Sequence, residues 1–153
     1  MRALACCWAL VGLPAEADVR IEGVDDELKA NILAHMRLDG EPCDQAPGRV
    51  RYQFERADEA IRAALRPFGY YDPLINSALE QPLDACWQAV FTIDPGQPVL
   101  VRAADVSVQG PGAELPVFTG LLDNSAIVVG ERLQHAVYEA TKNRLLVAAH
   151  EYG

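Results

Sequence analysis

The chain has 153 residues, which is enough for one ordinary domain or two small ones. Half of the residues are hydrophobic and 23% are charged, as in a soluble globular protein. The net charge of −9 argues against a nucleic-acid partner, because the sequence offers no basic patch that could neutralise phosphates. The same acidity disfavours tight binding to anionic lipid.

The first residues have the pattern of an export signal. Met1-Arg2 supplies a positive charge, residues 3–13 are apolar, and residues 14–17 contain an A-x-A cleavage pattern. The apolar run is shorter than the roughly 20 residues that a membrane-spanning helix needs. We therefore expect residues 1–17 to be a signal peptide that is removed before Asp18. A buried N-terminal helix is the alternative.

Export would leave two of the four cysteines in the mature chain. Cys6 and Cys7 lie in the predicted signal peptide, so Cys43 and Cys86 remain. In an oxidising compartment, such a pair predicts a disulfide. Two cysteines without a neighbouring histidine cannot fill a tetrahedral metal site, so metal binding by this pair is disfavoured. Two free buried thiols are the alternative to the disulfide.

The residues after the signal peptide predict one small α+β unit. An alternating pattern that stops at Gly23 predicts a first strand at residues 19–23. Asp25 or Asp26 can cap a helix that ends near residues 38–40. The order β-α-α-β-β is completed by a loop at 41–48, a helix from Phe54, a strand at 73–79, a hairpin loop at 81–85 and a strand at 87–94.

The second predicted helix has an apolar face and a charged face. The apolar face consists of Ala57, Ala60, Ile61, Ala64, Leu65 and Phe68, which recur at helical spacing. Its alanines keep this face thin, so we expect the helix to lie close against a sheet or a second helix. Gly69 can adopt the left-handed conformation that ends a helix. Tyr70 and Tyr71 follow, and we expect their rings to pack at the corner between helix and strand.

The two closing strands differ in character. Alternating apolar residues from Trp87 to Ile93 predict a strand that contributes Trp87 and Phe91 to the core. Pro73 places the strand at 73–79 on the edge of the sheet, because proline cannot donate to a central ladder. The predicted fold is therefore α+β, with two helices packed on a small mixed three-stranded sheet.

The same pattern begins again after Pro98, which indicates an internal repeat. Residues 105–110 resemble the first strand in pattern and terminal glycine, and helices are expected at 114–122 and 131–151. The two closing strands of the second copy are missing. We thus divide the mature chain into a first unit at 18–97 and a partial second unit at 98–153. The second unit should be poorly stabilised, because its single strand lacks a partner.

No group of residues indicates catalysis, a cofactor or a metal ion. His35, His135 and His150 are scattered without ligand spacing, so surface or partly buried structural roles are expected for them. The sequence has no Ser/His/Asp or Cys/His arrangement and no glycine-rich phosphate loop. We therefore expect neither an enzyme nor a cofactor-binding protein.

Three segments together resemble the POTRA domains of the TamA family, which belongs to the BamA-like superfamily of outer membrane protein assembly factors. The segments are Val19–Val24, Ala60–Leu65 followed by Phe68–Tyr71, and Phe91–Val99. The resemblance covers the first unit fully and the second in part. Members of this family continue through a third POTRA unit into a membrane β-barrel, so the resemblance assigns no insertase activity to these residues.

The resemblance implies a periplasmic scaffold at the outer membrane of a Gram-negative bacterium. Its implied partners are a TamB-like protein anchored in the inner membrane and unfolded outer membrane client polypeptides. Binding would proceed by β-augmentation, in which an extended chain adds to an exposed sheet edge. The expected edge consists of Leu74, Ile75, Asn76, Ser77, Ala78 and Leu79. The alternatives are a POTRA pair of BamA or a two-partner secretion transporter, and a free-standing periplasmic binding module.

Overall fold

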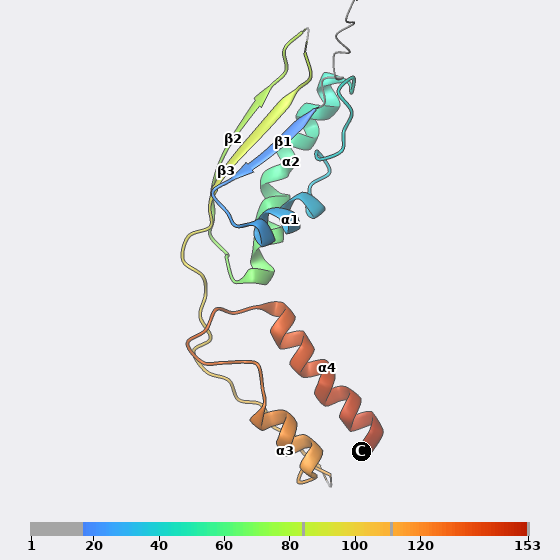
Figure 1. The fold of residues 1–153 in the computed structure, drawn as a ribbon, viewed down its shortest axis with the longest axis vertical. Coiled ribbons are helices and arrows are strands. Elements are labelled where there is room, and N and C mark those ends of the chain that lie inside the picture. Colours follow the sequence, from blue (N-terminus) through green and yellow to red (C-terminus); the bar gives the residue numbers. More distant parts are fainter. Residues whose placement is uncertain (1–16, 84, 111, 153) are drawn as a thin grey trace, which may run out of the picture.

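A computed structural model describes residues 17–83, 85–110 and 112–152. The described part of the chain is elongated, with a sheet and two helices at one end and a pair of helices at the other (Figure 1). We call residues 18–94 the sheet unit and residues 99–152 the helical unit. The predicted signal peptide, apart from Ala17, lies outside the described residues.

The sheet unit begins with a strand and a capped helix. β1 (Asp18–Glu22) leads into α1 (Asp26–His35). The side chain of Asp25 accepts a hydrogen bond of 2.9 Å from the backbone N–H of Leu28, so Asp25 is the N-cap residue. The helix is shorter than the sequence predicted, because the backbone is already extended at Met36. Met36 nevertheless remains buried, so the apolar pattern continues beyond the end of the helix.

The second helix begins earlier and ends earlier than the sequence predicted. α2 (Pro47–Leu65) starts within the expected loop, with proline in its first turn, where the missing N–H is not needed. A short 3-10 helix, η1 (Arg66–Phe68), follows. Gly69 ends it in the left-handed conformation with φ of 85°, as predicted.

Three strands form a mixed sheet in the order β1-β3-β2. β3 (Gln88–Asp94) is central, parallel to β1 and antiparallel to β2 (Leu74–Glu80). Ile21 and Ser77 lie on either side of Phe91. Both helices cover one face of this sheet (Figure 1). The predicted α+β architecture, with two helices on a mixed three-stranded sheet, is therefore confirmed.

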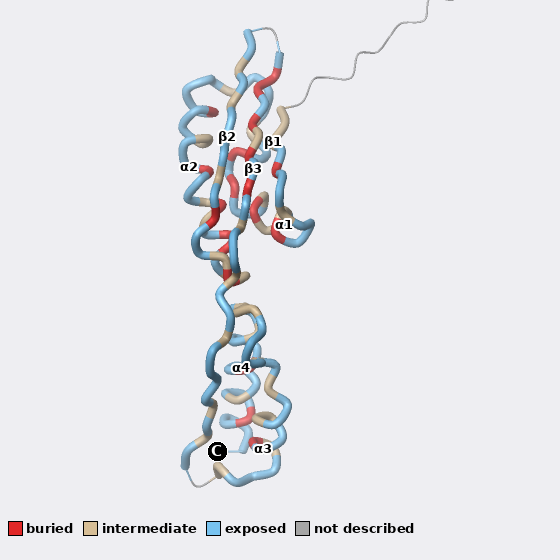
Figure 2. The backbone as a smooth tube through the Cα atoms, turned by 90° about the vertical axis from the view of Figure 1, so that its left-hand side faces the viewer, coloured by how far each residue is buried: buried red, intermediate tan, exposed pale blue. Residues whose placement is uncertain are grey.

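The hydrophobic core lies between the sheet and the two helices. Its buried members are Ile21, Leu28, Ile32, Met36, Leu38, Val50, Ala57, Ile61, Ala64, Leu65, Trp87, Ala89, Phe91 and Ile93. The predicted burial of Trp87 and Phe91 is confirmed, with 4% and 1% of their surface exposed. The rings of Phe54 and Phe91 lie 5.4 Å apart, which joins α2 to the central strand. Buried positions cluster in this unit (Figure 2).

The helical unit contains α3 (Pro116–Asp123) and α4 (His135–Tyr152). The strand expected at residues 105–110 is wrong, because this segment is not in a strand and makes no ladder with another segment. The helix expected from residue 131 begins later. A turn at Val129 and Gly130 instead leads into residues 131–133, which lie beside residues 99–101, with a bridge between Leu100 and Arg132.

None of the helices in the described part of the chain is both long enough and apolar enough to cross a membrane.

Candidate functional site

The candidate site is the free edge of β2. Within the described residues, β2 pairs only with β3, so one side of its backbone has no strand partner. No backbone hydrogen bond outside the β3 ladder involves residues 74–80 of the described chain. Alternate N–H and C=O groups along a strand point in opposite directions, so the free side presents a row of donors and acceptors.

Helix α2 fixes β2 at both of its ends. A guanidinium nitrogen of Arg62 donates a hydrogen bond of 3.0 Å to the carbonyl oxygen of Pro73, directly before the strand. Arg62 is itself held by an ion pair of 2.8 Å with Asp58. Beyond the other end of the strand, the side-chain amide of Gln81 donates a hydrogen bond of 3.3 Å to the backbone carbonyl oxygen of Pro47. The edge is therefore held against a rigid helix rather than carried on a loop.

The side chains of β2 are mostly small, polar and exposed. Ile75 and Leu79 point toward the helices and pack against the core. Asn76, Ser77 and Ala78 are exposed, and Leu74 leaves 67% of its surface in solvent. The middle of this edge thus carries no charge. Natural edge strands are commonly protected by charged side chains, so an uncharged edge is open to another strand.

The sheet has a second free edge that the sequence did not reveal. β1 occupies the other side of β3 and has no further strand partner among the described residues. Its alternate residues Asp18, Arg20 and Glu22 are charged, and Arg20 forms an ion pair of 3.1 Å with Asp18. These charges oppose the addition of an apolar strand, so β2 is the better candidate for a docking edge.

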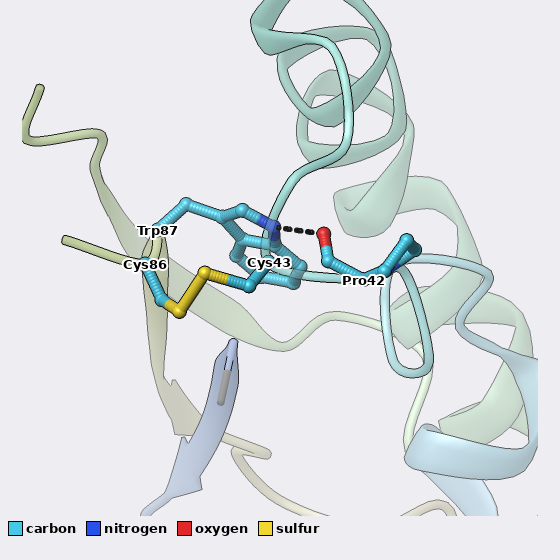
Figure 3. The surroundings of a disulfide bond; sticks show 4 residues. All are labelled: Pro42, Cys43, Cys86 and Trp87. Carbon is cyan, nitrogen blue, oxygen red and sulfur yellow. Dashed lines mark hydrogen bonds between the residues drawn. A yellow bond between two sulfur atoms is a disulfide. The ribbon is translucent and has the colours of Figure 1, made fainter. Parts of the chain in front are cut away.

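The expected disulfide is present between Cys43 and Cys86, whose Cα atoms lie 4.9 Å apart (Figure 3). It ties the loop between α1 and α2 to the residues just before β3. The indole N–H of Trp87 donates a hydrogen bond of 3.1 Å to the carbonyl oxygen of Pro42, beside the disulfide. Covalent and polar contacts thus secure the same loop to the sheet.

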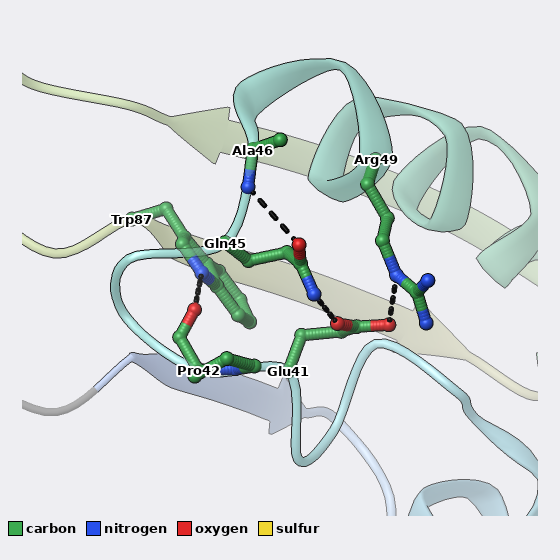
Figure 4. A network of polar contacts seen from close by, with 6 residues as sticks. All are labelled: Glu41, Pro42, Gln45, Ala46, Arg49 and Trp87. Atoms are coloured by element: carbon green, nitrogen blue, oxygen red, sulfur yellow. Dashed lines mark hydrogen bonds and ion pairs between the residues drawn. The ribbon is translucent and has the colours of Figure 1, made fainter.

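A carboxylate network holds this loop to α2 (Figure 4). Glu41 accepts a hydrogen bond from the side-chain amide of Gln45 and a bond of 3.0 Å from the guanidinium of Arg49. The bond from Gln45, followed by that from Arg49, lowers the pKa of Glu41 below its ordinary value. The network is structural, because the carboxylate is engaged with its own chain.

The histidines do not form a site together. His35 lies on the surface, where its Nδ1 is 2.8 Å from the carbonyl oxygen of Asn31 in the same helix. Nε2 of His135 is hydrogen-bonded to the hydroxyl of Tyr71 at 2.9 Å. His150 is exposed near the end of α4. In the described residues, no group of three or more His, Cys, Asp or Glu side chains could hold a metal ion.

The geometry can be compared with known proteins. A family model described as "POTRA domain TamA domain 1" matches residues 18–95, which includes the whole sheet and both of its helices. The chain belongs to the TamA POTRA family. The matched residues contain both free edges of the POTRA sheet and the disulfide.

Two solved structures are similar to this POTRA chain. One is a crystal structure of Haemophilus influenzae BamA POTRA3-5, with a TM-score of 0.39 and 18% sequence identity, covering 86% of this chain and 48% of that one. The other is POTRA1-2 of the periplasmic domain of Omp85 from Anabaena, with a TM-score of 0.39 and 18% identity, covering 91% of this chain and 79% of that one. The chain therefore spans about half the length of the BamA fragment.

Proposed function

We propose that this chain is the POTRA portion of a TamA-like assembly and translocation factor, which holds partner or client polypeptides by β-augmentation. The observation that carries the proposal is the free edge of β2, which is anchored at both ends by α2 and uncharged in its middle. An added strand would satisfy the free backbone groups, and main-chain hydrogen bonds would supply most of its affinity. The role is that of a scaffold rather than of an enzyme.

The proposed ligands are extended segments of outer membrane clients and of a TamB-like partner. Ile75 and Leu79 point into the core, whereas the opposite face of β2 carries Leu74, Asn76, Ala78 and Glu80. The edge therefore offers few side-chain contacts for sequence-specific recognition. A scaffold that binds mainly through main-chain hydrogen bonds suits clients that can form an extended strand but differ in sequence.

The proposed domain division follows the predicted repeat. Residues 18–97 form the first POTRA unit, a boundary supported by the family match to residues 18–95. Residues 98–153 form part of a second unit. The described segment at 102–109 is in neither a helix nor a strand and makes no backbone hydrogen bonds within the described chain.

A proline pair tests the docking edge. N–H groups of adjacent residues in a strand point to opposite sides, so Asn76→Pro and Ser77→Pro remove one inward and one outward donor. Amide hydrogen exchange of the parent identifies the outward residue, because its N–H is unprotected. The variant whose lost N–H points outward, away from β3, should keep the fold. It should no longer bind a short synthetic peptide of alternating valine and threonine, as measured by NMR titration. Unchanged binding by a folded outward variant would refute docking at β2.

A pair of lysine variants provides the matched control. Asn76 and Thr92 are cross-strand partners on the same exposed face, but only Asn76 lies on the edge strand. Asn76→Lys should weaken peptide binding, because lysine on an edge opposes strand addition. Thr92→Lys places the same charge on the central strand and should leave binding close to that of the parent. Equal effects of both variants would indicate a nonspecific charge effect and contradict the proposal.

Export to the periplasm is the proposed location. It is supported by the signal-like pattern of residues 1–17 and by the disulfide, which forms in oxidising compartments. Intact mass of the protein from the periplasm of a Gram-negative host tests it. The mass should correspond to a chain that starts at Asp18 and should increase by two hydrogens on reduction. Retention of Met1 with free thiols would contradict export.

A further inference from the structure

The sheet unit and the helical unit meet at the corner that follows Gly69. The backbone N–H of Val99 donates a hydrogen bond of 2.9 Å to the carbonyl oxygen of Gly69, and the N–H of Leu133 donates one of 2.8 Å to the carbonyl oxygen of Val99. The linker residue Val99 is thus bonded to the end of the first unit on one side and to the approach to α4 on the other.

The linker continues this pairing for two further residues. The N–H of Val101 donates a bond of 2.9 Å to the carbonyl oxygen of Glu131, and the N–H of Gly130 donates one of 2.8 Å to the carbonyl oxygen of Val101. A second chain segment therefore braces the linker. Pro95 and Pro98 stiffen its start, because proline fixes the backbone angle φ.

Two tyrosines of the corner contact the helical unit through their side chains. A guanidinium nitrogen of Arg132 donates a hydrogen bond of 3.2 Å to the hydroxyl of Tyr70. The guanidinium carbon of Arg132 also lies 5.5 Å from the centre of the Tyr70 ring, a cation–π distance. Tyr71, which is 44% exposed, is bonded through its hydroxyl to His135 at the first residue of α4.

The backbone at this corner is packed closely. A Cβ atom added to Gly69 would lie 2.6 Å from the carbonyl oxygen of Leu133, and Gly69 has φ of +85°. Any other residue would both strain the turn and push the helical unit away. The glycine therefore serves two purposes, since it ends η1 and allows the second unit to approach.

We propose that residues Gly69, Tyr70 and Tyr71, together with Val99, Arg132, Leu133 and His135, form a locked joint. Neighbouring domains joined by a small interface ordinarily move relative to one another. Here, directional backbone bonds on both sides of the linker and two aromatic contacts restrict bending and twisting. The joint makes the two units one rigid body, so it fixes the direction of the β2 edge relative to α4. This proposal is independent of peptide binding at β2.

Backbone ¹⁵N relaxation of the full chain tests the joint. In the parent protein, amides of β1–β3 and of α4 should report one shared, anisotropic rotational diffusion tensor. In the double variant Tyr71→Phe/Arg132→Ala, the apparent correlation time of α4 should fall below that of the sheet unit. The matched control is Tyr138→Phe/Arg144→Ala, which changes an exposed tyrosine and an exposed arginine of α4 outside the joint and should retain one tensor.

The outcomes separate a joint from a passive contact. Separate tensors in the parent, random-coil relaxation of α4 in the parent, or one shared tensor in the joint variant would each overturn the proposal. The variant's sheet amides should keep their chemical shifts, and its affinity for the valine–threonine peptide should remain that of the parent. In the proline variant of β2, loss of peptide binding would support docking at β2. A single diffusion tensor retained in the same variant would support the joint independently of that binding.

Discussion

Gly23 shows how a single residue determines the path from β1 into α1. Its φ is +88°, and an added Cβ would clash with the backbone carbonyl oxygen of Ile93 in the central strand, because it would lie much closer than van der Waals contact allows. Gly23→Ala should therefore lower the free energy of unfolding by more than the ~1–2 kcal/mol that a left-handed alanine costs alone. Gly40→Ala is the control, because Gly40 has φ of +104° with no atom within 4 Å of the added Cβ. Equal losses in urea unfolding would contradict the steric argument.

Glu41 gives the loop between α1 and α2 a dependence on pH. Its pKa is lowered from the ordinary value of 4.5, first by the hydrogen bond from Gln45 and then by that from Arg49. A lowered folded-state pKa means that its stabilising contribution is present above pH 4.5 and is lost as the pH falls through the folded-state pKa. Glu41→Gln should therefore destabilise the protein at neutral pH, with a difference from the parent that shrinks in acid.

Urea unfolding at neutral pH and below pH 4.5 measures this difference. Glu55→Gln is the matched control, because Glu55 is an exposed glutamate of α2 that has no ion pair within the described chain. Its difference from the parent should vary little over the same range. A Glu41→Gln penalty that is constant with pH would show that the lost bonds matter but not the charge.

Among the elements, the loop between α1 and α2 depends most on its covalent link to the sheet. Cys43 and Cys86 are 43 residues apart, and closing such a loop in the unfolded chain corresponds to about 4 kcal/mol in the chain-entropy account. The double variant Cys43→Ser/Cys86→Ser should lose up to this amount in denaturant unfolding. Reductant should destabilise the parent and leave the double variant unchanged. A parent that is insensitive to reductant would contradict a stabilising role.

Periodicity predicted the elements of the sheet unit but not the order of its strands. Apolar residues at spacings of two and of three to four identified β3 and the buried face of α2, because those residues face one core. The parallel pairing of β1 with β3 depends on contacts between residues about 70 apart, which no local pattern contains. The second free edge at β1 was missed for that reason.

Boundary errors have local physical causes. α2 begins at Pro47 because proline and glycine are tolerated in a first helical turn, although together they resemble a loop in the sequence. α1 ends at His35 while buried Met36 and Leu38 still follow, because apolar residues can enter the core from extended backbone. At the candidate site, Pro73 correctly predicted an edge strand, but the contact of Arg62 with its carbonyl oxygen requires the tertiary fold.

At the scale of the whole molecule, the two units differ in how much they bury. All buried members of the main core lie between Ile21 and Ile93. In the described part of the helical unit, the buried residues are Phe118, Thr141 and Ala148. Leu146 and Val147 of α4 are exposed. The strand predicted at residues 105–110 did not form, because a segment becomes a strand only when another strand pairs with it.

This imbalance predicts two unfolding transitions in urea. α3 and α4 should unfold first, because buried apolar area is the main source of stability and the helical unit has little of it. Trp87, which is buried in the sheet unit and is the only tryptophan of residues 18–153, reports the second transition by fluorescence, whereas far-ultraviolet circular dichroism reports both. Phe118→Ala should move only the first midpoint, and Ile61→Ala should move the second. Coincident transitions by both probes would instead show that the joint couples the units in stability as well as in orientation.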